Sequence, residues 1–225
     1  MDISSVINDN QILGQLTDDE KSLLAKVAKV RVYPRNTFIF WQNENVLNGY
    51  LLDKGLIKLY RSHQNGRTRT LSLKTDNDLI SELSLLFPFK HLCTAQVLNK
   101  SSVICFPVEE LTNIAGENSN FQKSIRQVVN VLIERSLMEI ENRIFMNING
   151  CLATKLIQLT NKFGVTKEGG TMINLKLSQQ QLADMIGTNR ETVCKALLMF
   201  KKCKAIGIKN KLITILNKSK LEAWQ

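Results

Sequence analysis

The side chains best suited to recognition chemistry lie close together near the C-terminus. Arg190, Glu191 and Lys195 fall on one side of a helix predicted over residues 190–202. A guanidinium matches O6 and N7 of guanine, a carboxylate accepts a hydrogen bond from N4 of cytosine, and an ammonium group can reach a guanine or a phosphate. This combination predicts contact with duplex DNA. The alternative for Glu191 is a solvated surface acid, but an acid aimed at DNA lowers affinity unless it reads a base.

The pattern around these residues predicts a helix-turn-helix followed by a wing. Ser178 is suited to cap a first helix, and Gln181 stands at the capping-box position. A three-residue turn, Gly187-Thr188-Asn189, leads into the second helix, whose expected buried residues are Val193, Leu197, Leu198 and Phe200. The apolar runs 206–208 and 212–215 then flank Lys209-Asn210-Lys211, which predicts a two-stranded wing with a basic tip.

The charge distribution agrees with this assignment. The 225 residues carry a net charge of +10. Residues 149–225 hold 13 lysines and arginines against four acids, a net +9, whereas residues 1–148 are almost neutral at +1. This split indicates a near-neutral module joined to a module that binds a polyanion. The alternative is a basic surface that contacts only solvent.

Short β-rich runs separated by turn residues follow a helical segment at 18–30. They occupy residues 37–41, 49–52, 56–62, 67–73, 93–98 and 103–107, with Asn65-Gly66 as the turn of one hairpin. This spacing predicts an antiparallel β-barrel or jelly roll over residues 1–117, and with the helices an α+β fold class.

One long helix is predicted over residues 118–148, which contain no proline and no glycine. Apolar residues recur at 121, 125, 128 and 132, and again at 129, 133, 137, 140 and 144. Two stripes suggest that one side packs on the barrel and the other on a second copy of the chain. The alternative is a helix covered within one subunit. Asn147, Asn149 and Gly150 are expected to form a hinge before the C-terminal domain, 149–225, which begins with a helix at 151–163 and a strand at 173–177.

Several classes of protein are not expected. No apolar run approaches the roughly 18 residues of a membrane-spanning helix, and residues 1–5 lack the charged region and apolar core of a secretory signal, so a cytoplasmic protein is expected. The five cysteines are scattered, which predicts neither a disulfide framework nor a zinc site. Two histidines, no glycine-rich phosphate loop and no hydrolase motif leave little with which an enzyme could work.

Residues 177–197, LSQQQLADMIGTNRETVCKAL, resemble the winged helix-turn-helix of the Crp/Fnr family of bacterial transcription regulators. The resemblance extends to residues 52–60 and 78–86, which are similar to the cyclic-nucleotide-binding fold of that family. It implies a homodimer that binds a palindromic operator in double-stranded DNA and recruits or obstructs RNA polymerase.

The family likeness assigns roles to single residues. Arg190, Glu191 and Lys195 are expected to read bases; family members usually have arginine where Lys195 stands, so an altered half-site is expected. Contacts to phosphates are expected from six further residues: Ser178, Gln180, Thr188, Asn189, Lys209 and Lys211.

The sensor departs from the cyclic-nucleotide pattern. Where that pattern has a glycine-glutamate-leucine turn, this chain has Ser81-Glu82-Leu83, and His91-Leu92 replaces the arginine-serine pair. Without a guanidinium the phosphodiester charge would be poorly compensated, so an effector other than cAMP, or none, is expected. The expected pocket residues are Leu71, Leu73, Ser81, Glu82, Leu83, His91, Ser136 and Leu137. His91 is either a weak donor or an exposed loop residue.

No cofactor is expected. Residues 1–92 contain no cysteine, which argues against the N-terminal iron–sulfur cluster of oxygen-sensing members. Cys194, beside Lys195, suggests redox control as a hypothesis, against a small residue tolerated at a packed position. Two further alternatives stay open: a regulator that is active without effector, and an interaction module whose basic end binds protein or RNA.

Overall fold

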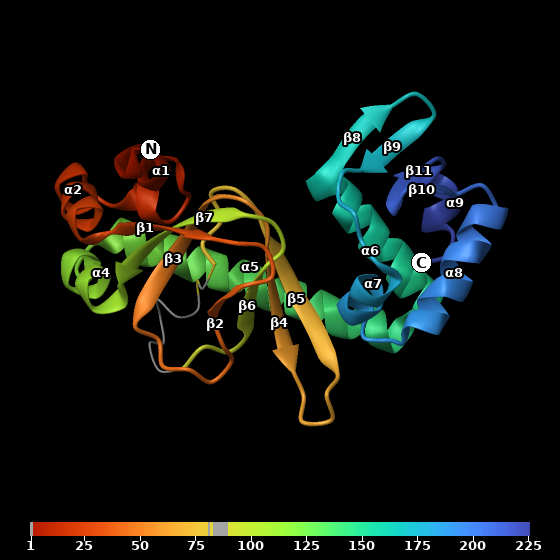
Figure 1. The fold of residues 1–225 in the computed structure, drawn as a ribbon, viewed down its shortest axis with the longest axis horizontal. Coiled ribbons are helices and arrows are strands. Elements are labelled where there is room, and N and C mark those ends of the chain that lie inside the picture. The colour runs from red at the N-terminus through yellow and green to blue at the C-terminus, as the bar shows by residue number, and fades with distance from the viewer. Residues whose placement is uncertain (1, 81, 83–89) are drawn as a thin grey trace. The chain divides into compact units, whose positions relative to one another are not determined.

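The computed structural model describes residues 2–80, 82 and 90–225, and it confirms the α+β fold class: N-terminal antiparallel sheets, a long helix and a C-terminal helix-turn-helix (Figure 1). The chain divides into two compact units. The first holds the residues up to Arg67 together with Leu71–Glu134, and the second holds Thr68–Thr70 and Arg135–Gln225.

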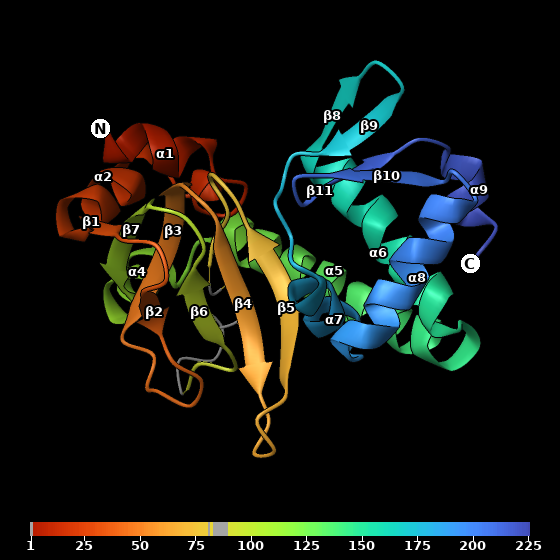
Figure 2. The same ribbon diagram turned by 45° about the vertical axis from the view of Figure 1, so that its right-hand side comes forward.

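The N-terminal part combines short helices with two antiparallel sheets. Its elements are α1 (Ile3–Asp9), the 3-10 turn η1 (Leu13–Gln15), α2 (Asp18–Val27), β1 (Lys29–Tyr33), β2 (Phe38–Phe40), β3 (Asn48–Lys54), β4 (Ile57–Ser62), β5 (Thr68–Lys74), β6 (Thr94–Val97), β7 (Ser101–Pro107) and α4 (Val108–Ala115). The strand orders are β1-β7-β3 and β2-β6-β4-β5, which Figure 2 shows from a second side. The predicted strands are thus present, whereas the helix predicted over 18–30 ends at Val27 and the chain continues into β1.

Two apolar clusters fill the first unit, one on each side of β3. Neighbouring side chains of a strand point to opposite faces. Accordingly, Leu51 joins the cluster that contains the N-terminal helices, and Leu52 joins the cluster enclosed with Ile57 and Val97. Both leucines are completely buried, so β3 is covered on both faces. This is the enclosed core expected of a jelly roll.

The predicted hairpin of β4 and β5 turns at Gly66. The Gly66 N–H donates to the His63 carbonyl at 3.0 Å, and Gly66 has a φ of +78°. Asn65, the other residue of the predicted turn, is not among the residues with positive φ. Only the glycine therefore supplies the conformational freedom that the turn needs.

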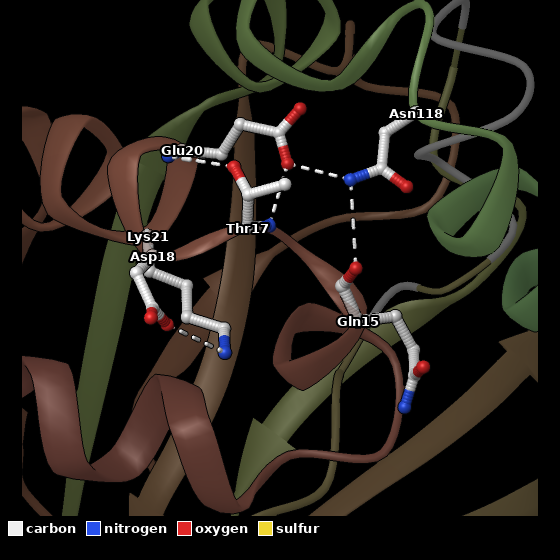
Figure 3. A network of polar contacts seen from close by, with 6 residues as sticks. All are labelled: Gln15, Thr17, Asp18, Glu20, Lys21 and Asn118. Atoms are coloured by element: carbon white, nitrogen blue, oxygen red, sulfur yellow. Dashed lines mark hydrogen bonds and ion pairs between the residues drawn. The ribbon is translucent and has the colours of Figure 1, made fainter.

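A polar network joins α2 to the start of the long helix α5 (Ser119–Phe145) (Figure 3). Thr17 and Glu20 form a capping box, in which the Thr17 N–H donates to the Glu20 carboxylate at 2.7 Å. The Asn118 amide donates to the same carboxylate at 2.6 Å, and Asn118 Oδ1 accepts from the Phe121 N–H at 2.9 Å. Burial alone would raise the pKa of Glu20, but these hydrogen bonds lower it overall.

Replacing Asn118 by alanine is expected to lower the free energy of unfolding of the first unit by about 1–2 kcal/mol, because both the cap of α5 and a bond to Glu20 are lost. Urea unfolding followed by circular dichroism measures the loss. Lys26→Ala is the matched control: Lys26 lies exposed in the last turn of α2, so its loss is expected to stay below about 0.5 kcal/mol. Equal losses in the two variants would contradict the role given to Asn118.

The long helix α5 has the two stripes that its sequence predicts. Phe121 and Ile125 are buried in the first unit, and Val128 packs against the same cluster. The second stripe is exposed over four residues spaced by four, three and four: Ile133 (53%), Leu137 (55%), Ile140 (54%) and Ile144 (69%). Each of these four side chains is therefore less than half covered by the rest of the described chain.

The break after α5 is shorter than predicted. Helix α6 (Ile148–Phe163) begins three residues earlier than expected, capped by Asn147, whose side chain accepts from the Gly150 N–H at 3.0 Å. Asn149 and Gly150 therefore lie inside α6, so of the three residues predicted to form the hinge only Asn147 stands at the break. Gly150 is needed for packing, because a Cβ there would stand 2.7 Å from the Trp224 carbonyl.

The second unit continues with a four-stranded sheet and three helices. Its elements after α6 are β8 (Gly164–Lys167), β9 (Gly170–Ile173), α7 (Gln179–Ile186), α8 (Arg190–Lys202), β10 (Ile206–Lys209), β11 (Leu212–Ile215) and α9 (Lys218–Glu222). The sheet order is β10-β11-β9-β8. Two predictions need correction: the strand placed at 173–177 ends at Ile173, and the wing hairpin β10–β11 is half of a larger sheet because β11 also pairs with β9.

Candidate nucleic-acid interface

The first helix of the helix-turn-helix is fixed at both ends by local sequence. The Ser178 hydroxyl accepts from the Gln181 N–H at 3.1 Å, and the Gln181 side chain accepts from the Ser178 N–H at 2.8 Å. At the other end Gly187 has a φ of +69°, and its N–H donates to the Ala183 carbonyl at 2.7 Å. The predicted capping box and turn glycine are confirmed.

The second helix, α8, begins at a separate cap. Asn189 Oδ1 accepts from the Thr192 N–H at 2.8 Å and from the Thr192 hydroxyl at 2.7 Å. On its inner side, Val193, Leu197 and Phe200 are buried and anchor the helix to the unit. The cap and the anchor together present the N-terminal end of α8, with its partial positive charge, to the surface.

The end of α5 also holds the motif. The Arg143 guanidinium donates to the carbonyl of Ile186, at the C-terminal end of α7, at 3.2 Å. A Cβ at position 187 would meet the ends of the Arg143 and Arg69 side chains, which can shift, so it is the positive φ that favours glycine there. Within the second unit, Arg143 therefore couples the last turns of α5 to the turn that precedes α8.

The structure brings the three predicted base-reading residues to one exposed side of α8. Arg190, Glu191 and Lys195 are all exposed. A surface hollow of about 620 Å³ adjoins the first two and is lined by Gln179, Asn189, Arg190, Glu191 and Cys194. Lys195 lies one turn beyond Glu191 on the same side. Their base-reading roles stay predictions.

The predicted phosphate-binding residues differ in their exposure and in the hydrogen bonds that they already make within the chain. Three of them already make local bonds: Ser178 and Asn189 are helix caps, and the Gln180 side chain donates to Asp184 at 2.9 Å. Thr188 is half-buried in the turn. Lys209 and Lys211 are exposed at the wing tip, where Asn210 and Lys211 both have positive φ, as a two-residue hairpin turn requires.

The sequence-based prediction misplaced one residue of α8 and missed one residue of the interface. Leu198, predicted to be buried, is 55% exposed. Gln179 was missed although it lines the hollow at Arg190 and a second one of about 490 Å³ that extends to Lys211 on the wing. Cys194, which the sequence places beside Lys195, also lines the first hollow.

Only part of the predicted effector pocket can be located, because Ser81 and Leu83 lie outside the described residues. The Glu82 carboxylate forms an ion pair with the Lys74 ammonium, and both side chains are at most 16% exposed. Leu73 is buried on β5, whereas Leu71 is 45% exposed. Glu82 is thus already neutralised by a partner of its own unit.

The two helical residues expected in that pocket, Ser136 and Leu137, are exposed and belong to the second unit. All five cysteines are free thiols. In the part of the chain that the structure describes, no group of three or more histidine, cysteine, aspartate or glutamate side chains is arranged to hold a metal ion.

His91 is buried, so the alternative that places it in an exposed loop is wrong. It is 2% exposed, and its ring stacks on Phe40 with centroids 3.7 Å apart. Its backbone N–H donates to the Glu44 carbonyl at 2.8 Å. Burial lowers the pKa of His91 from 6.5 to about 4, against a smaller opposing effect of the Glu44 carboxylate. At neutral pH the ring is therefore uncharged.

The stability of the first unit is expected to fall as the pH is lowered from about 6.5 to about 4. Over this range the unfolded chain binds a proton at His91 that the folded chain does not, which costs at most about 3 kcal/mol. Urea unfolding at pH 7 and pH 4.5 measures the difference. His91→Phe, which keeps a stacked ring and removes the proton site, should show a smaller loss; an identical loss in both proteins would contradict this account.

Two known domain families match this chain, one in its N-terminal part and one in its C-terminal part. A sequence model of the cyclic nucleotide-binding domain matches residues 30–118, and one of the Crp-like helix-turn-helix domain matches residues 152–224. The global nitrogen regulator of Nostoc sp. is 30% identical over 188 residues, 83% of this chain and 84% of that protein. The CRP-like cAMP-activated global transcriptional regulator of Mycobacterium tuberculosis is 24% identical over 84% of both chains.

Among solved structures, a transcriptional regulator of the CRP/FNR family from Thermus thermophilus has the same fold, with a TM-score of 0.70 at 18% identity over 87% of this chain and 97% of that one. The chain belongs to the Crp/Fnr family of DNA-binding transcription regulators. Among the described residues, no helix has both the length and the apolar character needed to cross a membrane.

Proposed function

We propose that this protein regulates transcription as a homodimer that reads a palindromic operator with one α8 helix per half-site. The observation that carries the proposal is the exposed row Arg190, Glu191 and Lys195 on a helix anchored by Val193 and Phe200. Because the buried side of α8 fixes the helix, these three polar side chains are held in a defined arrangement on its exposed side. Such an arrangement favours readout of base edges in the major groove.

The dimer is supported by the exposed stripe of α5. The spacing of Ile133, Leu137, Ile140 and Ile144 is that of the a and d positions of a coiled coil. Four large apolar side chains, each more than half exposed on one line, are costly for a monomer in water. A second copy of the same helix covers them with the same residues, as a two-fold axis requires.

Binding to DNA is tested by selection from a random duplex pool with the purified chain, followed by affinity measurements on the selected and on scrambled duplexes. We expect an inverted repeat, bound at least about 1000-fold more tightly than scrambled DNA. Equal affinity for both duplexes, or preference for RNA, would contradict the proposal. How the bound dimer acts on RNA polymerase, by recruitment or by obstruction, is then read from transcription in vitro on a promoter with the selected site.

The wing lysines are expected to strengthen binding without selecting sequence. Lys209→Ala with Lys211→Ala should weaken binding to every duplex by a similar factor. The slope of log affinity against log salt should flatten by about 0.9 for each phosphate that the variant no longer neutralises. Titrations at about 50 and 200 mM salt measure this, with Lys218→Ala as a control because Lys218 pairs with Glu222 away from the wing tip. A change in the selected sequence would contradict the phosphate role.

For the sensor we propose an effector other than cAMP, or none. One named relative is cAMP-activated. In this chain Glu82 is paired with Lys74, and the neutral His91 cannot supply the positive charge that a buried phosphodiester needs. Calorimetric titration with cAMP, with operator affinity measured in parallel, is expected to show neither heat nor a change in affinity; tight binding of cAMP would contradict this part of the proposal.

A further inference from the structure

Two apolar side chains interrupt the charged surface of α8. Leu198 is 55% exposed and Met199 is 40% exposed, although the core of the unit begins directly behind them at Leu197 and Phe200. Their neighbours along the outer surface are the exposed lysines Lys195 and Lys202. Exposed apolar residues are common on protein surfaces, so what distinguishes this pair is its place between two lysines on α8.

Leu198 continues the line of the predicted base-reading residues. It lies seven positions after Glu191 and three after Lys195, spacings that return to the same side of a helix. At a rise of about 1.5 Å per residue it stands about 10 Å along the axis from Glu191 and about 4.5 Å from Lys195. Successive bases of a strand are about 3.4 Å apart, so Leu198 can reach a base one or two steps beyond that of Lys195.

The charge around Leu198 indicates what covers it. A partner protein with an apolar surface would have to bury Lys195 and Lys202 without compensation, which is costly. DNA compensates both lysines with phosphates, and its major groove offers one apolar group, the 5-methyl of thymine. We propose that Leu198 packs on a thymine methyl in each half-site and so selects thymine at that position. This inference rests on the proposed DNA-binding function.

The test removes the methyl group from the DNA and the side chain from the protein. Uracil differs from thymine only by the missing methyl, so each thymine of the selected operator is replaced by uracil in turn, in both half-sites. For the unaltered protein we expect one position at which the replacement weakens binding by about fourfold per half-site, the effect of one buried methyl group. For L198A, thymine and uracil at this position should bind equally well.

Leu216→Ala is the matched control, because Leu216 is 46% exposed and lies outside α8. It should keep the full difference between thymine and uracil. The inference is overturned if no position is sensitive in the unaltered protein, or if L198A keeps the same sensitivity. Failure of the unaltered protein to prefer any duplex would instead contradict the proposed function, so the two failures are distinguishable. Since Leu198 is exposed, L198A is expected to fold, which its unfolding midpoint verifies.

Discussion

Leu137→Glu is expected to convert the dimer into a monomer and to abolish tight operator binding. Leu137 is 55% exposed in one chain and lies at the middle of the stripe. In a two-fold dimer the substitution buries two like charges opposite each other. The cost of an uncompensated buried charge is about 3 kcal/mol or more, so we expect the dimer dissociation constant to rise at least about 100-fold. Sedimentation equilibrium across a range of concentrations measures it.

The control for this variant is Arg135→Gln, which changes the charge by the same amount on the opposite side of α5 and should leave the dimer intact. The unfolding midpoint of Leu137→Glu at low protein concentration, where the parent is also monomeric, should equal that of the parent. A dimer of undiminished stability in Leu137→Glu would show that the subunits meet elsewhere.

Arg190→Ala is expected to weaken operator binding by about 30-fold or more and to remove the preference for one base pair in each half-site. A bidentate contact to guanine contributes about 1–3 kcal/mol of discrimination, and a palindrome contains it twice. The affinity of the variant is measured for the operator and for operators in which each base pair is replaced by each of the other three. These affinities separate the loss of base discrimination from the loss of one positive charge.

The wing variant Lys209→Ala is the control for Arg190→Ala, because it removes one positive charge from a residue that is not expected to contact a base. It should lower all affinities by one factor and leave every base preference in place. If Arg190→Ala also lowered all affinities uniformly, Arg190 would be a phosphate contact, and the direction in which α8 enters the groove would have to be reassigned.

Those features that depend on neighbours in the sequence could be predicted. The capping box at Ser178, the glycine at 187 and the apolar period of α5 are local signals, because each follows from contacts within four or five residues. The exposed position of Arg190 follows from the same helix period. Thus the frame of the candidate interface could be derived before its geometry was known.

Features that depend on distant parts of the chain could not be predicted. His91 is buried because Phe40, fifty-one residues earlier, covers its ring. The wing joins a four-stranded sheet because β9 pairs with β11, which no pattern near β11 indicates. Leu197 and Leu198 are equivalent by composition, and only the packing of α8 decides which one is buried. The exposure of Leu198 matters most of these, because it leaves this side chain available for the proposed contact with DNA.

The central claim is that two chains read two inverted half-sites about one helical turn apart. The most direct measurement is the mass of the complex on the selected duplex, determined beside a duplex from which one half-site has been removed. We predict two 25.5-kDa chains on the complete operator and a large loss of affinity on the half-operator. One chain per operator, bound equally well to the half-operator, would contradict the account.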